Sequence, residues 1–447
     1  MNEFPKDIFR SYDIRGLLAE VTSEVARQAG MALVMKTGAK TVVVGRDMRS
    51  TSPELQQAAI EGITSMGANV IDIGMCSTSM YNFAISSQEH VQAGLMVTAS
   101  HNPPEYNGIK MAYHSGRPIP GVEIYQLLPV EAPSGIIVGS VSSQDVLATY
   151  LDRCLSLANL PDVSGSKIVV DYGNGIGAVS VRPLAQRLGL QLIELYPEPD
   201  ARFPNHEPNP AIEANLTALK QTIVREQADF GIALDGDADR IGFVDNEGQA
   251  LRGDQMLALI AKDVLSQSPK ARVILAPNQS WISGEVVRQH CGEPVEVQIG
   301  RTFVIGAMHD YEAEIGGEVS GHFFFREMGG LESVDFALAN VLGIWKRSGQ
   351  TFAQLTIEVQ KYANSWEVNF EVHDKQKILN ALEEKYTHTA TLTKKIDGIR
   401  CEFNHDWWFI VRPSNTEPLI RLIVEATSEA LMREKLEEIV AFIKENA

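Results

Sequence analysis

The sequence predicts an α/β protein with three related α/β domains that have mixed sheets, followed by a smaller α+β domain. A strand–helix–strand pattern occurs three times before residue 300. The chain has 447 residues, which is too long for a single hydrophobic core. After residue 360, apolar and polar residues alternate as they do in strands that lie half-buried on an antiparallel sheet. We therefore expect four domains, at residues 1–140, 141–247, 248–360 and 361–447.

Each of the first three domains contains an apolar strand, a helix and a second strand. The apolar strands form continuous runs, which is typical of strands buried on both faces of a parallel or mixed sheet. Ser52 and Pro53 mark the start of the first of these helices, because Pro is favoured in the first helical turn. The three copies comprise residues 41–45, 54–66 and 68–73, then 167–171, 178–188 and 190–196, then 271–276, 281–290 and 294–299.

The last domain has a different pattern. A helix is predicted between its strands, and a second helix closes the chain. The closing helix carries an apolar stripe at helical spacing, which predicts that it covers one face of a small sheet. The predicted strands are 366–372, 389–395, 399–403, 407–412 and 419–426, the first helix is 375–386, and the stripe consists of Met432, Leu436, Ile439, Val440 and Ile443.

The composition excludes several classes of protein. Apolar residues make up 44% and charged residues 21%, and no apolar run approaches the roughly 20 residues that a membrane span requires. The net charge of −18 would repel nucleic acid. The start of the chain lacks the pattern of a secretory signal. The four cysteines are scattered without a metal-ligand spacing, so we expect reduced thiols in a cytoplasmic protein.

The strongest chemical signal is a loop in which Asp235, Asp237 and Asp239 alternate with small residues and Arg240 follows at once. Apolar, β-like segments flank the loop, which places it between two strands. Three carboxylates this close repel one another unless a cation lies between them, and oxygen ligands suit a hard ion such as Mg²⁺ or Ca²⁺. An EF-hand is excluded because its sixth position requires Gly and here holds Arg240. A solvated acidic turn is the alternative, and a metal site is the better interpretation.

A second segment joins a hydroxyl, an imidazole and an amine. Ser100 and His101 leave a buried strand and enter a turn fixed by Asn-Pro, and a further predicted turn at Asn107-Gly108 brings Lys110 near the same loop. From the residues alone, a nucleophilic Ser100 and a purely turn-forming Ser100 are equally supported, because no GxSxG elbow surrounds it.

Two further segments carry polar groups suited to sugars and phosphates. In an extended run, Glu318, Ser320 and His322 would share one face and could hold sugar hydroxyls. A loop near the C-terminus offers a guanidinium, hydroxyls and an amide for an oxyanion, at Arg412, Ser414, Asn415 and Thr416. A polar strand edge and a proline-flanked turn are the respective structural alternatives.

The segments Gly45–Arg49 and Asp171–Gly175 lie at strand ends and are interpreted as structural turns. The function of the segment around Arg15 cannot be read from its local chemistry.

Five motifs in one order, YDIRG, TASHNP with YNGIK, DGDADR, GEVSGH and RPSNTEP, extend over the whole chain. This set resembles the α-D-phosphohexomutase superfamily, and within it the bacterial phosphomannomutase/phosphoglucomutase branch. The resemblance implies four domains around a central cleft, with a C-terminal domain similar to the TATA-binding protein. It implies a phosphosugar substrate, a cytoplasmic protein that is a monomer or a homodimer, and no nucleic-acid or membrane partner.

The resemblance also implies a role for each motif. Ser100 would carry a phosphoryl group, and the metal ligands would be Asp235, Asp237, Asp239 and an oxygen on Ser100, holding Mg²⁺. The phosphorylated serine would be bordered by His101, Lys110, Arg240 and Arg15. Sugar hydroxyls would be bound by Glu318, Ser320 and His322 with Arg301 nearby, and the non-reacting phosphate by Arg412, Ser414, Asn415 and Thr416.

The implied reaction interconverts hexose 1-phosphate and hexose 6-phosphate, with mannose and glucose as the expected sugars, through a phosphoserine enzyme and a hexose 1,6-bisphosphate that also serves as activator. A metal-dependent sugar-phosphate phosphatase, a phosphoglucosamine mutase and a non-catalytic sugar-phosphate sensor are the alternatives. Gln298, Arg301 and Asn278 depart from the residues common in the superfamily, and they leave the sugar preference open.

Overall fold

The computed structural model describes residues 4–372, 374–413 and 419–446. The chain forms two compact units. The first unit comprises the chain up to Arg252 together with Ser320–Gln354, and the second comprises Gly253–Val319 and the chain from Leu355 onward. The division between the units runs through the third predicted domain, and the four predicted domain boundaries stay predictions.

The first sheet of the first unit has the strand order β1-β5-β4-β2-β3-β6. β2, β3 and β4 run parallel, so their carboxyl ends meet at one edge of the sheet, while β5 pairs antiparallel with β4. The strands are β1 (Ile14–Leu17), β2 (Thr41–Arg46), β3 (Asn69–Met75), β4 (Ala93–Val97), β5 (Tyr106–Tyr113) and β6 (Val141–Ser143). The helices are α1 (Ser23–Thr37), α2 (Ser52–Ser65), α3 (Thr78–Ser86) and α4 (Gly121–Tyr125), after the short 3₁₀ turn η1 (Lys6–Ile8).

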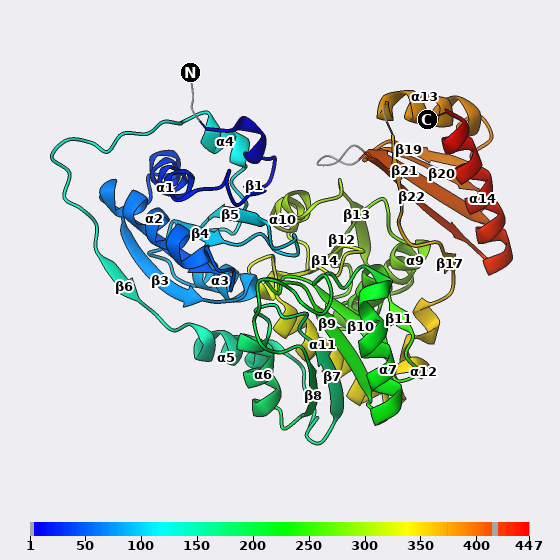
Figure 1. Cartoon of the computed structure of the whole chain (residues 1–447). Helices are drawn as coiled ribbons and strands as arrows, with labels where there is room; N and C mark the ends of the chain where they lie inside the picture. The colour runs from blue at the N-terminus through cyan, green and yellow to red at the C-terminus, as the bar shows by residue number, and fades with distance from the viewer. Residues whose placement is uncertain (1–3, 373, 414–418, 447) are drawn as a thin grey trace. The chain divides into compact units, whose positions relative to one another are not determined.

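Two glycines allow α1 and α2 to pack side by side (Figure 1). A Cβ atom on Gly62 would lie 2.0 Å from the carbonyl oxygen of Arg27, and one on Gly30 would lie 2.5 Å from that of Ala59. Because these distances are far below van der Waals contact, any larger residue would push the helices apart. Buried side chains of both helices then join the apolar core above the sheet.

The second sheet of the first unit has the order β11-β10-β9-β7-β8, in which β7 pairs parallel with β8 and β9. β9 and β10 form an antiparallel hairpin. The strands are β7 (Lys167–Asp171), β8 (Gln191–Leu195), β9 (Phe230–Leu234), β10 (Ile241–Asp245) and β11 (Ala250–Leu251). The neighbouring elements of this unit are α5 (Leu147–Leu157), α6 (Ala178–Arg187), η2 (Glu213–Leu216), α7 (Thr217–Glu226), β15 (Phe323–Phe325), η3 (Arg326–Met328), β16 (Leu331–Glu332) and α11 (Val334–Ser348).

The second unit contains a parallel arrangement and an antiparallel sheet. β12 pairs parallel with both β13 and β14, and β22 pairs antiparallel with β17, β18 and β21. The first arrangement consists of α8 (Gly253–Gln267), β12 (Arg272–Leu275), α9 (Trp281–Gln289), β13 (Glu293–Glu296), α10 (Arg301–Asp310) and β14 (Ile315–Gly317). After α12 (Phe352–Thr356) and η4 (Ile357–Val359) come β17 (Ala363–Asn364), β18 (Val368–Glu371), α13 (Lys375–Tyr386), β19 (Leu392–Lys394), β20 (Ile399–Phe403), β21 (Trp407–Pro413), β22 (Leu419–Ala426) and α14 (Glu429–Asn446).

The predicted fold class is confirmed, and one predicted turn is wrong. Three parts of the chain combine strands and helices, and an antiparallel sheet with α13 and α14 follows them. Asn107-Gly108 does not turn the chain, because both residues lie inside β5. A Cβ atom on Gly108 would lie 2.4 Å from the carbonyl oxygen of Thr98. Glycine is therefore required at position 108 because the backbone approaches Thr98 closely there. The Asn-Gly pair does not form a hairpin turn.

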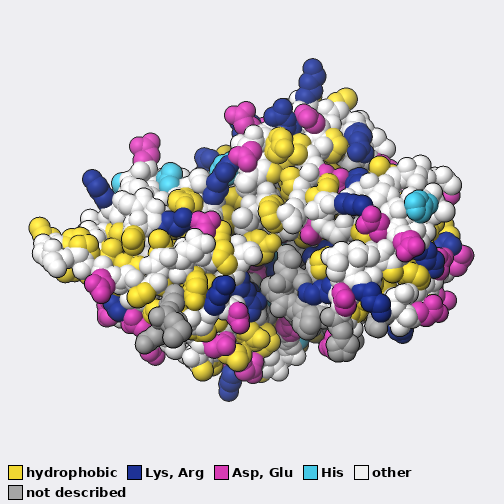
Figure 2. Space-filling model, turned by 90° about the horizontal axis from the view of Figure 1, so that it is seen from above, with side chains coloured by type: hydrophobic (Ala, Val, Ile, Leu, Met, Phe, Trp, Pro, Cys, Tyr) yellow, Lys and Arg dark blue, Asp and Glu magenta, His cyan; other side chains and the backbone are white. Residues whose placement is uncertain are grey.

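Charges of both signs are distributed over the surface. Figure 2 shows Lys and Arg side chains interspersed with Asp and Glu side chains on the face that it draws. That face carries no continuous surface of one charge. Within the described parts of the chain, no helix is both long and apolar enough to cross a membrane.

A buried polar cluster lies between α5 and α11 in the first unit. The hydroxyl of Tyr150 donates to Asp335 Oδ2 at 2.8 Å and lies 2.7 Å from Ser333 Oγ. All three side chains are buried. Burial raises the pKa of the Asp335 carboxyl from its ordinary 3.8 to about 6. The charged form of Asp335 therefore costs the folded state free energy at neutral pH.

We expect Asp335→Asn to stabilise the protein above pH 6 and to have little effect near pH 4. A raised pKa means that the carboxyl costs nothing below its unfolded value of 3.8 and reaches its full cost above about 6. A shift of this size corresponds to about 2–3 kcal/mol in the free energy of unfolding. Urea unfolding at several pH values measures it, with the exposed Asp152 changed to Asn as control. An equal effect of Asp335→Asn at pH 4 and pH 7 would contradict the prediction.

Candidate functional site

Three carboxylates converge in the loop between β9 and β10. Asp235, Asp237 and Asp239 are buried, and each offers an oxygen that lies within 4.8 Å of the others. The loop folds this tightly because Ala238 adopts a left-handed φ of 53° and because residue 236 is a glycine. A Cβ atom at that position would lie 2.5 Å from the carbonyl oxygen of Ser100. The prediction of a tight acidic loop between two strands is confirmed by the hairpin.

Two cations, Lys110 and Arg240, and the imidazole of His322 from the same unit surround this cluster. Lys110 Nζ lies 2.7 Å from Asp237 Oδ2 and 2.7 Å from Asp239 Oδ2. His322 Nε2 lies 3.1 Å from Asp239 Oδ1, and Arg240 Nε lies 3.9 Å from Asp235 Oδ2. The positive groups partly compensate the repulsion between three buried negative charges.

The pKa values of the three acids diverge as a result. Burial would raise the pKa of Asp239, but Lys110 and then His322 outweigh it and hold that pKa well below its ordinary value. Burial, together with the charges of Asp239 and Asp237, raises the pKa of Asp235 well above its ordinary value. Without a further cation, Asp235 therefore resists ionisation.

The cluster fits a metal ion. Asp237 Oδ1 is buried and has no hydrogen-bond partner among the described residues, although its Oδ2 accepts from Thr78 at 2.7 Å and from Thr98 at 3.2 Å. A buried oxygen of this kind loses its solvation unless a ligand compensates it. The set of hard oxygen donors would suit a divalent cation. The buried triple-Asp group could therefore hold a metal ion.

The hydroxyl of Ser100 reaches into this cluster. Ser100 Oγ donates to Asp235 Oδ2 at 2.9 Å and lies 3.2 Å from Nδ1 of His101. Ser100 has a φ of 50°, which is uncommon for a residue other than glycine, and its N–H donates to Thr98 Oγ1 at 2.9 Å. Such backbone strain is found at functional sites, where the surrounding structure maintains it.

The carboxyl ends of three neighbouring parallel strands build this site. β4 leads into Ser100, β3 leads to Thr78 at the start of α3, and β2 leads into Arg49. Lys110 enters from β5, where it lies opposite Met96 of β4. Ligand sites in α/β proteins form at this edge because the loops after parallel strands converge there.

His101 contacts Ser100, and Arg15 contacts Asn102 of the same loop. Arg15 Nη1 donates to Asn102 Oδ1 at 2.8 Å, and its Nη2 pairs with Asp13 at 2.5 Å. Burial would lower the pKa of Arg15, but the charges of Asp13 and Asp237 outweigh it and raise that pKa. Burial, with the charges of Arg240 and Arg15, lowers the pKa of His101 well below its ordinary value.

Arg49 is a site residue that the sequence analysis interpreted only as part of a turn. Its buried guanidinium donates to four backbone carbonyl groups of the serine loop, those of Ser100, Asn102, Pro103 and Tyr106. No local signal identified this role, because the four acceptors are backbone atoms more than fifty positions away. Thr78 and Thr98 were missed as partners of Asp237 because their sequence separations from it are 159 and 139 residues.

The prediction that Glu318–His322 is extended is wrong. A turn occupies Val319–Gly321, and Gly321 has a φ of 93°. The turn requires glycine there, because a Cβ atom would meet the carbonyl oxygen of Ile241 at 2.7 Å. Ser320 Oγ nevertheless lies 2.9 Å from His322 Nδ1, so these two side chains stay together without sharing a strand face.

The remaining predicted residues belong to the second unit. Glu318 accepts from the N–H of Gly300 at 3.0 Å, directly before Arg301 begins α10. Arg412 lies 3.2 Å from Glu367 and 3.9 Å from Asp397 at the end of β21. Ser414, Asn415 and Thr416 lie outside the described residues.

Comparison with known proteins identifies the family. Four family descriptions match in chain order: "Phosphoglucomutase/phosphomannomutase, alpha/beta/alpha domain" I at residues 6–128, II at 148–248 and III at 252–362, and the C-terminal domain at 367–442. The chain belongs to the phosphoglucomutase/phosphomannomutase family. The predicted resemblance to phosphohexomutases is confirmed, as is the predicted enzyme class.

Individual relatives cover nearly the whole chain. A protein of Xanthomonas campestris pv. campestris named "Phosphohexose mutases" is 34% identical over 95% of this chain and 96% of its own length. A "Probable phosphoglucosamine mutase" of Methanopyrus kandleri is 35% identical over 98% of this chain and 97% of its own length. A crystal structure of a phosphoglucomutase/phosphomannomutase family protein from Burkholderia thailandensis has a TM-score of 0.90 and 32% identity, covering 99% of this chain and 98% of that chain.

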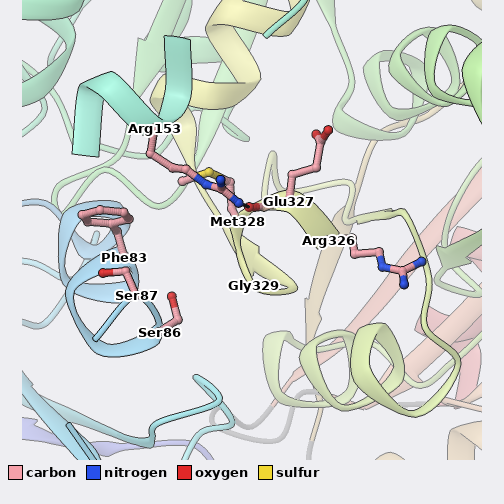
Figure 3. Close-up of a pocket in the computed structure, with 8 residues that line it drawn as sticks. All are labelled: Phe83, Ser86, Ser87, Arg153, Arg326, Glu327, Met328 and Gly329. Atoms are coloured by element: carbon pink, nitrogen blue, oxygen red, sulfur yellow. Dashed lines mark hydrogen bonds between the residues drawn. The ribbon is translucent and has the colours of Figure 1, made fainter. Parts of the chain in front are cut away.

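A separate hollow of about 440 Å³ lies at the C-terminal end of α3. None of the predicted site residues that the structure describes lines it. Figure 3 shows Arg326 and Glu327 pointing away from α3, so their charges are not directed at Ser86 and Ser87. The lining residues are Phe83, Ser86, Ser87, Arg153, Arg326, Glu327, Met328 and Gly329.

We expect a divalent cation to raise the unfolding temperature of the wild-type protein. An ion at about 100 times its Kd adds about 2.7 kcal/mol to the free energy of unfolding, or roughly 5 °C for a unit of this size. Asp237→Asn should remove most of this rise. Asp245→Asn is the control, because Asp245 is a buried carboxylate that caps the β10 turn through the N–H groups of Glu247 and Gln249. Calorimetry with and without EDTA measures the shift, and an equal shift in Asp237→Asn would refute the ion site.

Proposed function

We propose that this protein is a Mg²⁺-dependent phosphohexomutase that interconverts hexose 1-phosphate and hexose 6-phosphate, with mannose and glucose as its sugars. The observation that carries the proposal is the 2.9 Å contact between Ser100 Oγ and Asp235 inside the buried triple-Asp cluster. A hydroxyl held against a cation site, with several positive side chains around it, is the arrangement that phosphoryl transfer requires.

The proposed reaction uses Ser100 as a temporary carrier. The bond between Ser100 Oγ and phosphorus breaks as the free hydroxyl of a hexose monophosphate bonds to that phosphorus and gives a hexose 1,6-bisphosphate. The sugar hydroxyl gives up its proton to a protein base, and Ser100 Oγ gains a proton as it leaves. The bisphosphate then presents its other phosphate, and Ser100 Oγ takes that phosphoryl group back. Mg²⁺ bound by the three aspartates and the serine oxygen would neutralise charge on the transferring group.

The positive side chains around Ser100 are proposed to divide into two roles. Arg15 and Arg240 keep their protons at any working pH, so they act as fixed positive charges. Lys110 and His101 can exchange a proton, and His101 Nδ1 lies 3.2 Å from Ser100 Oγ. The proton of the attacking sugar hydroxyl is therefore assigned to Lys110 or His101.

Substrate binding is proposed from the motifs of the chain. Glu318, Ser320 and His322 would hold sugar hydroxyls, with Arg301 beside them. The phosphate that does not react would be bound by Arg412, Ser414, Asn415 and Thr416. Glu318 and His322 both already engage polar partners, and a sugar would add to or replace these contacts.

Three further properties belong to the proposal. The substrate is a small phosphosugar, and the net charge of −18 argues against nucleic acid as a partner. The free cysteines among the described residues agree with a reducing, cytoplasmic location. The protein acts as a monomer or as a homodimer, and hexose 1,6-bisphosphate activates it by phosphorylating Ser100.

A phosphoglucosamine mutase is the second candidate within the same reaction class. The relative from Methanopyrus kandleri carries that name. Gln298 and Asn278 leave fewer positive charges in this chain than the superfamily commonly has at those positions. A sensor is disfavoured because Ser100 and all three acids of the metal loop are retained, and a phosphatase is disfavoured because the chain shows no separate DxDx(T/V) nucleophile motif.

We expect Ser100→Ala to lower the rate of sugar phosphate interconversion by about 10⁴-fold or more, because it removes the only proposed carrier oxygen. The fold should persist, since the change deletes one hydroxyl. Ser156→Ala, on the exposed side of α5, is the control and should retain full activity. Near-normal turnover by Ser100→Ala would defeat the assignment.

Phosphorus NMR discriminates the candidate reactions. Mannose, glucose and glucosamine 1-phosphates are offered in parallel, each with a catalytic amount of hexose 1,6-bisphosphate. We expect the 6-phosphates of mannose and glucose to form faster than that of glucosamine, with little inorganic phosphate. Faster turnover of glucosamine 1-phosphate would establish the second candidate, and inorganic phosphate in excess of isomerised sugar would establish a phosphatase.

A further inference from the structure

The segment between β8 and η2, residues 196–212, is unusually long for a connection without helix or strand. Connections of this length within a compact domain are generally functional. Tyr196 and Phe203 adopt φ values of 52° and 47°, which are strained for residues other than glycine. The segment leaves the carboxyl end of β8, at the sheet edge where β9 leads into the metal loop.

One contact of this segment faces the serine loop. The guanidinium carbon of Arg49 lies 5.4 Å from the centre of the Phe203 ring. Phe203 is buried, so the cation–π contact is shielded from water. Arg49 is also the residue that donates to the carbonyl oxygen of Ser100 at 3.1 Å. Phe203 therefore restrains the side chain on which the serine loop depends.

Another contact faces the metal loop. A Cβ atom on Gly236 would lie 2.5 Å from the carbonyl oxygen of Ser100 and 3.5 Å from Cγ of Pro208. Gly236, between two of the aspartates, is thus in close contact with the serine loop, and Pro208 lies next to it. The carbonyl oxygen of Gly236 also accepts from the N–H of Ile176 at 3.0 Å, in the loop that follows β7.

An ion pair anchors the segment to the carboxyl end of β7. His206 Nε2 lies 3.1 Å from both carboxylate oxygens of the buried Asp171, and its Nδ1 lies 2.8 Å from the carbonyl oxygen of Glu207. Acceptors at both ring nitrogens favour the imidazolium form. Asn205 adds a hydrogen bond of 2.7 Å to Asn174. Asn205 and His206 therefore hold the segment against Asn174 and Asp171 at the carboxyl end of β7.

We propose that residues 196–212 act as a positioning strap, which fixes the serine loop against the metal loop through Phe203 on Arg49, Pro208 on Gly236 and His206 on Asp171. The inference rests on the proposed function, since the value of this spacing lies in phosphoryl transfer from Ser100. Phe203 and His206 are positioning residues, because they act through Arg49 and the β7 loop and do not touch the reacting atoms. Transfer between rigidly spaced groups is sensitive to displacements of about 1 Å.

The first test separates positioning from stability. Phe203→Leu keeps an apolar side chain but loses the ring, and His206→Gln keeps one donor but loses the charge. Each should lower kcat by about 10- to 100-fold with KM changed less than about twofold. Phe203→Trp, which retains an aromatic face for Arg49, should restore most of the activity.

Two controls accompany these variants. Arg202→Ala changes an exposed side chain of the same segment, whose partner is Asp200, and should leave kcat unchanged. Val181→Ala opens a cavity in the core under α6, so it should reduce thermal stability while keeping kcat. The strap is refuted if Phe203→Leu and His206→Gln keep kcat within twofold of the wild-type value. It is also refuted if Val181→Ala lowers kcat as much as these two variants do, because the loss would then follow from reduced stability.

The second test does not depend on activity. Hydrogen exchange of the peptide that contains Ser100 and Asn102 should accelerate by about tenfold or more in Phe203→Leu and His206→Gln, and not in Arg202→Ala. Exchange unchanged in all three variants would overturn the inference even in an active enzyme. If the wild-type protein lacks mutase activity but the two variants loosen this peptide, the proposed function fails while the strap stands.

Discussion

The structure of the site depends on holding three buried carboxylates within 4.8 Å of one another. Repulsion between such charges in a low-dielectric environment is strong, so the cluster persists only with compensating cations. Lys110 bonds two of the acids at 2.7 Å, and His322 lies 3.1 Å from one of them. The third acid, Asp235, has a raised pKa and faces the hydroxyl of Ser100. An added divalent ion would balance the remaining negative charge of the three carboxylates. Its binding site would then lie next to the hydroxyl of Ser100.

Because of this constraint, the site depends on unusual backbone conformations and on a side chain that binds backbone carbonyl groups. Ser100 and Ala238 both adopt left-handed backbone conformations, at φ values of 50° and 53°. Strain of this kind requires partners that over-determine the conformation. Arg49 provides them for the serine loop by binding four carbonyl groups, and the strap at residues 196–212 covers Arg49 in turn. The strained backbone, the buried guanidinium of Arg49 and the strap thus all maintain the spacing between the serine loop and the metal loop.

Much of the fold and the centre of the site could be predicted from the sequence. The strand at Lys167–Asp171 and the acidic hairpin were predicted correctly, because apolar runs and closely spaced carboxylates are local signals. The turn at Asn107-Gly108 was wrong, since Gly108 is required by a backbone approach that only the folded chain creates. Arg49 and Thr78 were missed for a related reason: their partners, the carbonyl of Ser100 and the carboxylate of Asp237, are remote in sequence. Tertiary contacts between backbone and side chain leave little trace in local composition.

The central claim is that the oxygen of Ser100 carries the phosphoryl group. The most direct measurement is to incubate the protein with hexose 1,6-bisphosphate labelled with ³²P at both phosphates, and then to map the label by proteolysis and mass spectrometry. The account predicts acid-stable label on the peptide that contains Ser100, which is discharged when unlabelled hexose monophosphate is added. Label on an aspartate of the metal loop, or interconversion of sugar phosphates without any labelled protein, would contradict it.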